Sequence, residues 1–184
     1  MEDLSLHLLD IVENCTAAGA SLVEIHIAED AANDRLEIRI KDNGRGMDAA
    51  LAATATNPFV TTRTTRRVGL GLPLLKMAAE EAGGALTIDS TPGVGTEVTA
   101  SFQDSHIDRK PLGDIAGTLV ALILGHPEID FSYTHVRGGE TIELDTRELK
   151  EQLGTVPIGT PAVLNMIRTH LAGAGGDRQG ENHG

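Results

Sequence analysis

Apolar residues recur at helical spacing near the start of the chain and predict a helix over residues 4–18. The members of this apolar stripe are Leu8, Ile11, Val12 and Cys15. On a neighbouring face, His7, Asp10 and Asn14 follow the spacing i, i+3, i+7. Because Asp10 and Asn14 are one turn apart, both side chains can reach one ligand.

Two segments of strict alternation follow, and they predict antiparallel strands with one apolar face each. Apolar residues occupy every second position in 23–27 and again in 36–40. The polar pair Asn33-Asp34 joins the two segments as a turn. Asp42 falls where the second strand ends.

The pattern then changes several times along the chain. Residues 47–56 predict a short helix, whereas 57–68 are rich in Thr and Arg, have no clear period and indicate a mobile loop. Residues 70–82 predict a helix that tolerates Pro73 in its first turn, and a second hairpin spans 86–102. Together these elements predict an α+β fold, a two-layer α/β sandwich whose sheet is mixed but largely antiparallel.

The chain is expected to divide after the second hairpin. Residues 1–104 form the predicted main domain, and the composition shifts at a linker over 105–111. Residues 112–172 predict a small α/β extension in which a hairpin lies between two helices. The Gly-rich, polar residues 173–184 indicate a disordered tail.

Composition and charge narrow the function classes. The 184 residues include 27 acids and 15 bases, and this net charge of −12 argues against general affinity for nucleic acid or an anionic membrane. The single cysteine, Cys15, excludes an internal disulfide and suits a reducing cytoplasm. No signal peptide is visible, and the longest apolar segment, 115–124, is shorter than a membrane span of about 20 residues. We therefore expect a cytoplasmic protein.

The first candidate for chemistry is the glycine turn Asp42-Asn-Gly-Arg-Gly-Met47. Asp42, directly after a strand, can accept a hydrogen bond from an adenine amino group, and Gly44 and Gly46 let the backbone approach a flat ring. An ordinary surface turn is the alternative, since such residues are common turn formers. Turn propensity explains the glycines but not the aspartate.

The second candidate is the pair of polar residues on the first helix. The carboxamide oxygen of Asn14 suits Mg²⁺, which keeps several waters and takes few protein ligands. The Asp10 carboxylate, one turn away, can act as a general base. The alternative is the exposed polar face of an amphipathic helix.

The third candidate is the glycine pair that opens the helix over 70–82. Bare backbone amides of Gly69 and Gly71 at a helix N-terminus can bind phosphate with help from the helix dipole. Three arginines, Arg63, Arg66 and Arg67, precede this pair and form a positive cluster in an acidic protein. A solvated loop is the alternative, because a glycine pair alone is weak evidence.

Taken together, five segments in a fixed order resemble the motifs of the ATP-binding domain shared by gyrase B subunits, MutL, histidine kinases and related chaperones, the GHKL or Bergerat fold. The matching segments are Glu13–Ala20, Asp42–Met47, Asn57–Arg63, Gly69–Leu72 and Gly93–Thr96. The resemblance covers residues 4–103 and is closest to histidine-kinase-like ATPases and anti-sigma-factor kinases, here as a stand-alone protein.

This resemblance implies roles for individual residues. Asn14 matches the family's Mg²⁺ asparagine, and Asp42 matches the residue that reads adenine. ATP and Mg²⁺ are therefore the expected cofactors. The remaining residues expected around ATP are Gly44, Gly46, Met47, Phe59, Arg63, Arg66, Arg67, Gly69, Leu70, Gly71, Leu72 and Thr96.

Two departures from the family pattern bear on the reaction. Hydrolytic branches carry Glu four positions before the Mg²⁺ asparagine, whereas this chain has Asp10, which is one methylene shorter. Glu13 is the alternative base, because kinase-like members often carry an acid directly before the asparagine. No separate helix with a phospho-accepting histidine is found before residue 4, and His7 is interpreted as a packing histidine.

These observations favour a Mg-ATP-binding regulatory protein that signals to, or phosphorylates a Ser or His on, a separate and unidentified protein. The alternatives are a non-catalytic, ATP-gated protein-binding switch and a slow ATPase. Neither nucleic acid nor a membrane is an expected partner, and a homodimer is compatible with the sequence.

Overall fold

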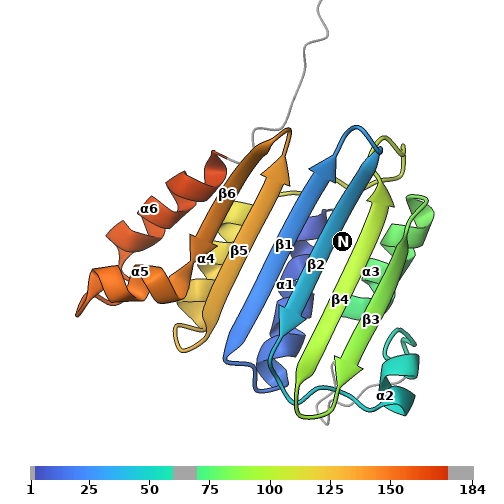
Figure 1. Ribbon diagram of the computed structural model, residues 1–184, viewed down its shortest axis with the longest axis horizontal. Helices are drawn as coiled ribbons and strands as arrows, with labels where there is room; N and C mark the ends of the chain where they lie inside the picture. Colours follow the sequence, from blue (N-terminus) through green and yellow to red (C-terminus); the bar gives the residue numbers. More distant parts are fainter. Residues whose placement is uncertain (1–2, 60–69, 174–184) are drawn as a thin grey trace, which may run out of the picture.

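Six strands form one mixed sheet in the computed structural model, which describes residues 3–59 and 70–173 (Figure 1). Their order across the sheet is β3-β4-β2-β1-β5-β6. β1 and β5 are parallel, and every other neighbouring pair is antiparallel. The strands are β1 (Leu22–Asp30), β2 (Arg35–Asp42), β3 (Ala85–Thr91), β4 (Gly95–Gln103), β5 (Asp130–Arg137) and β6 (Glu140–Asp145). The predicted mixed, largely antiparallel sheet is confirmed.

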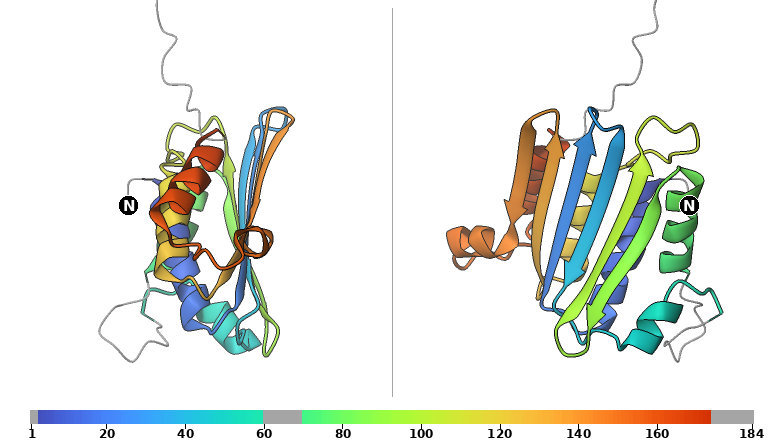
Figure 2. Two further views of the ribbon diagram at one scale, coloured as in Figure 1. Left: turned by 90° about the vertical axis from the view of Figure 1, so that its left-hand side faces the viewer. Right: turned by 45° about the vertical axis from the view of Figure 1, so that its right-hand side comes forward.

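Four helices cover one face of this sheet and complete the predicted two-layer α+β arrangement (Figure 2). They are α1 (Leu4–Ala17), α3 (Gly71–Glu81), α4 (Ile115–Gly125) and α6 (Pro161–Ala172). The short helix α2 (Ala49–Thr54) lies beside β3. The helix α5 (Thr146–Leu153) follows β6 and was not predicted, because it is short and mostly polar, with only Leu149 and Leu153 as an apolar pair one turn apart.

The alternating apolar residues of the first hairpin lie at the centre of the core. Ile25 lies opposite Ile40 and Ile27 opposite Ile38, so one face of the β1–β2 ladder is aliphatic. The apolar stripe of α1 packs onto this face and is buried. The predicted helix and strand periods are therefore confirmed where both elements bury one face.

The last third of the chain extends the same sheet. β5 pairs in parallel with β1 over the full length of β5, and α4 packs against α1 and α6. The segment over 105–111 is also held in place, because the Leu4 amide donates to the carbonyl of Pro111 at 2.9 Å. The division into a main domain, a linker and an extension remains a prediction, since one continuous sheet includes both sides of the segment.

His7 lies on the core side of α1, with only 2% of its surface exposed. Neither ring nitrogen has a hydrogen-bond partner among the described residues. Burial, followed by positive charge that includes Lys110, lowers the pKa of His7 from 6.5 to about 4, and Asp3 acts in the opposite direction. The ring is therefore neutral at physiological pH, as expected for a packing histidine.

We predict that His7 makes the fold sensitive to mild acid. Above pH 6.5 the ring is neutral in both the folded and unfolded chain, but between pH 6.5 and about 4 only the unfolded chain takes up the proton. The free energy of unfolding should fall by about 3 kcal/mol across this window. His7→Leu should flatten this slope in urea unfolding, whereas His170→Gln, at an exposed position on α6, should retain it. An unchanged slope in His7→Leu would contradict the assignment.

Candidate functional site

Asp42, the last residue of β2, is held in a fixed position at the end of the sheet. It is 7% exposed, and its Oδ1 accepts a hydrogen bond from the Gly44 amide at 2.7 Å. The next residue, Asn43, secures the turn, because its Oδ1 accepts from the amides of Ser21 and Leu22 at 2.9 and 3.0 Å. The strand therefore ends in a carboxylate whose orientation is set by the turn that follows it.

Gly44 and Gly46 are glycines because other chain segments approach them closely. A Cβ on Gly44 would lie 2.9 Å from the carbonyl oxygen of Ala18, beyond the end of α1. Gly46 has φ +66°, and a Cβ there would lie 2.1 Å from the carbonyl oxygen of Thr91 in the β3–β4 turn. The turn is thus wedged between the end of α1 and the second hairpin.

The second hairpin brings Met47 and Thr96 to the same place. The Met47 amide donates to Ser90 Oγ at 2.8 Å, and Ser90 Oγ lies 2.8 Å from Thr96 Oγ1. Thr96 is paired with Asp42 across β2 and β4. Three residues predicted for the site, from two separate motifs, therefore gather around the end of β2.

The N-terminus of α3 lies against the polar face of α1. A Cβ on Gly71 would lie 3.1 Å from Asp10 Cβ and 3.7 Å from Asn14 Nδ2, so the two helices approach closely at this glycine. Among the described residues, no side chain caps α3 at Leu70. The first amides of α3 have no partner within the helix and are suited to an anion.

Asp10 and Glu13 have different surroundings. Asp10 is exposed and lies beside Gly71, as the close approach of the two helices requires. Glu13 Oε1 is 3.1 Å from Nε2 of His126, the residue that ends α4, and Nδ1 of His126 is 3.7 Å from Glu128. The acid directly before Asn14 is therefore linked to the C-terminal part of the chain.

Cys15 lies on α1 beneath the glycine turn. Its thiol donates to the carbonyl of Ile11 at 3.2 Å. Burial, and then the neighbouring Asp42 carboxylate, raise the pKa of this thiol above its ordinary value. The Cys15 side chain is therefore a protonated, uncharged neighbour of Asp42.

Several predicted residues lie apart from this group or cannot be placed. Phe59 is 93% exposed, and Leu70 also lies at the surface. Leu72 is partly buried against the core. The residues outside the described ranges are Arg63, Arg66, Arg67 and Gly69, together with the rest of the predicted loop beyond Phe59.

The sequence analysis did not identify the residues that contact the site from distant positions in the chain. Ser90 and His126 contact Met47 and Glu13 from positions far along the chain, so no local pattern connects them. Asn43 was part of a quoted motif, but its bonds to the start of β1 required the structure.

Comparison with known proteins agrees with this geometry. The family model described as "Histidine kinase-, DNA gyrase B-, and HSP90-like ATPase" matches residues 2–106. The chain belongs to this family. The match to this histidine kinase-, gyrase B- and HSP90-like ATPase family covers α1, the first hairpin, the glycine turn, α2, α3 and the second hairpin. β5, β6 and the helices α4 to α6 lie beyond it.

Curated relatives match somewhat more than half of the chain. A "Putative sensor protein" of Shewanella frigidimarina is 37% identical over 101 residues, which cover 52% of this chain and 15% of that protein. The "Cell-division control histidine kinase PdhS" of Brucella anthropi is 29% identical over 120 residues, covering 58% of this chain and 11% of the relative. This chain therefore corresponds to a small part of each.

A solved structure resembles a larger part of the fold. The "Crystal Structure of N terminal domain of a DNA repair protein" superposes with a TM-score of 0.56 at 17% identity, covering 86% of this chain and 59% of that chain. At this identity the likeness shows the fold alone. Within residues 3–59 and 70–173, no helix has both the length and the apolar character needed to cross a membrane.

We predict that a side chain at Gly46 would destabilise the fold strongly, because another part of the backbone lies directly against this glycine. Gly46→Ala should lower the free energy of unfolding by at least about 2 kcal/mol more than Gly93→Ala, as measured by urea denaturation. Both glycines have positive φ, but a Cβ on Gly93 would meet no described atom within 4 Å, so Gly93→Ala reports the backbone strain alone. Equal losses in the two variants would show that the β3–β4 turn does not press on the glycine turn.

Proposed function

We propose that this chain binds Mg-ATP and acts as a regulatory protein of the histidine-kinase-like type, which signals to or phosphorylates a separate protein. The observation that supports this proposal is the position of Gly71, at the start of α3, directly against Asp10 and Asn14 on α1. An anion on the first amides of α3 would lie beside a carboxamide and a carboxylate, the arrangement needed for a metal-bound phosphate chain.

The residues present fit Mg-ATP as a ligand. Asp42 supplies a fixed acceptor for an adenine amino group, and the glycine turn that follows holds this carboxylate in place. Among the described residues, no three His, Cys, Asp or Glu side chains come together as a metal site. This agrees with Mg²⁺ held by Asn14, waters and phosphate oxygens rather than by a protein cage.

Positioning and charge neutralisation would then carry the reaction. Bound Mg-ATP supplies the transferable γ-phosphoryl group. Asp10 is placed to orient and deprotonate the acceptor, because it is exposed beside Gly71. The arginines at 63, 66 and 67 are proposed to neutralise phosphate charge.

The phosphoacceptor is proposed to be a Ser or His on a separate protein in the cytoplasm. His7 is the histidine nearest to Asp10 in sequence, but it lies on the buried face of α1 and would have to leave the core to react. The printed names of the relatives, a sensor protein and a histidine kinase, agree with a signalling role.

An ATP-gated switch without turnover is the second candidate, and the surroundings of Glu13 favour it. Because Glu13 is paired with His126, the alternative base is directed toward α4. Asp10, the remaining base, is one methylene shorter than the glutamate of hydrolytic relatives. ATP would then act by stabilising one conformation of the chain.

Asn14→Asp tests the ATP site itself. The substitution adds a second carboxylate one turn from Asp10 and places negative charge beside the phosphates. We expect the affinity for a non-hydrolysable Mg-ATP analogue to fall at least tenfold in calorimetry, or about 1.4 kcal/mol. Asn165→Asp, at an exposed position on α6, is the matched control and should bind like the wild type. Equal binding by both variants would refute the ATP site.

Asp10→Asn and Glu13→Gln distinguish the kinase from the switch. We expect Asp10→Asn to bind the analogue normally but to lose phosphate release or transfer by about 100-fold, the effect of removing a general base. Glu13→Gln should retain most of the turnover. The reverse result would assign the base to Glu13. Wild-type turnover in both variants would exclude both carboxylates as the base, whereas wild-type protein that binds the analogue but shows no turnover would favour the switch.

A further inference from the structure

A cavity of about 360 Å³ lies at the end of the sheet away from Asp42. It is formed where β1 and β5 end, where α4 begins and where α6 ends. Its volume is within the range of pockets that bind small molecules. None of the residues assigned to the ATP site lines it.

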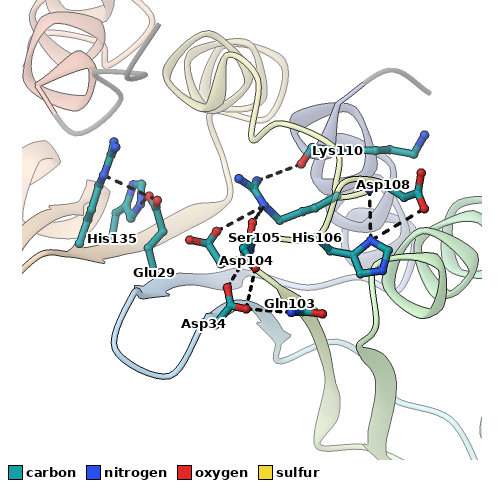
Figure 3. A network of polar contacts seen from close by, with 11 residues as sticks. Glu29, Asp34, Gln103, Asp104, Ser105, His106, Asp108, Lys110 and His135 are labelled. Atoms are coloured by element: carbon teal, nitrogen blue, oxygen red, sulfur yellow. Dashed lines mark hydrogen bonds and ion pairs between the residues drawn. The ribbon is translucent and has the colours of Figure 1, made fainter. Parts of the chain in front are cut away.

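One wall of the cavity is a buried polar network of Tyr133, His135 and Glu29, of which Figure 3 shows His135 and Glu29. The Tyr133 hydroxyl lies 3.2 Å from His135 Nδ1, and His135 Nε2 lies 2.7 Å from Glu29 Oε1. Tyr133 and His135 are 2% and 4% exposed. Burial raises the pKa of the Tyr133 hydroxyl, so it remains a donor. Polar groups buried this deeply are costly unless they are satisfied, and here they meet at a cavity.

The charges around the cavity are balanced in pairs. Arg137 Nε is 3.6 Å from Glu29 Oε2, and Arg109 Nε is 3.3 Å from Asp104 Oδ1. A third carboxylate, Asp114, caps α4 and pairs with Arg168 at 2.9 Å. The three carboxylates thus each have an arginine partner. Arg168 lies outside the lining, and with it the charged side chains at the cavity balance, three acids against three arginines. A ligand with net charge would meet no surplus of the opposite sign.

We propose that this cavity is a second ligand site, specific for a small zwitterion such as a free α-amino acid. The ligand carboxylate would meet Arg109 and Arg137, and its ammonium group would meet Glu29 and Asp104. A zwitterion satisfies both signs at once and adds no net charge to these balanced pairs. The apolar part of the wall, Leu112, Ile115 and Leu171, would contact the ligand side chain. This site is independent of the ATP site, and its test does not require nucleotide.

The first experiment is calorimetric titration of the full chain, without nucleotide, with each of the common α-amino acids in the millimolar range. We expect at least one to bind with saturable one-to-one stoichiometry. The corresponding carboxylic acid without the amino group, and the amine without the carboxylate, should each bind at least tenfold more weakly. Absence of binding by every amino acid, or equal binding of the acid or the amine, would overturn the proposal.

A cavity-filling variant locates the site. Ala116, on α4, lines the cavity, so Ala116→Leu should reduce the affinity at least tenfold while leaving the charged pairs in place. Ala121→Leu, at an exposed position on the same helix, is the matched control and should bind like the wild type. Arg137→Gln gives a second measure that does not depend on how Ala116→Leu folds, and it should also bind at least tenfold more weakly. Wild-type affinity in Ala116→Leu or in Arg137→Gln would overturn the assignment.

Discussion

Hydrogen bonding along both edges of β1 is the constraint on which the rest of the structure depends. On one edge β1 pairs with β2, which ends in Asp42, and on the other it pairs with β5. The β1–β5 register places Glu29 opposite Arg137 at one end of the sheet and Leu22 opposite Asp130 at the other. A central strand cannot shift without breaking both ladders, so the glycine turn and the C-terminal part of the chain are held in one frame.

The candidate ATP site is built mainly from close approaches between backbone segments. Gly44, Gly46 and Gly71 each lie where a side chain would meet another element. Few charged groups are concentrated there among the described residues, which agrees with an acidic protein that would bind phosphate through helix amides. The glycine turn and α3 also sit on different elements, so their spacing is set by α1 and the sheet. A substitution at any of these glycines would therefore disturb the packing of the candidate site as well as its surface.

Local pattern predicted much of this arrangement. The period of the first helix, the two hairpins and the glycine turn all depend on neighbours in sequence, and the structure has each of them. The polar helix α5 had no period to reveal it. Three contacts join distant segments: the parallel pairing of β1 with β5, the hydrogen bond that the Met47 amide donates to Ser90, and the contact between His126 and Glu13. These contacts are decided by packing of the whole chain, which a single sequence does not display.

The parallel register of β5 has a consequence for the length of the connection before it. Phe131, Tyr133 and His135 occupy alternate positions and are all buried, so they share one face of the strand. Adding or removing one residue between His126 and Asp130 would force a choice. Either β5 would turn these side chains to the opposite face of the sheet, or α4 would withdraw His126 from Glu13. The number of residues in this short connection is therefore under tighter constraint than their identity, and homologous chains should vary in its sequence but not in its length.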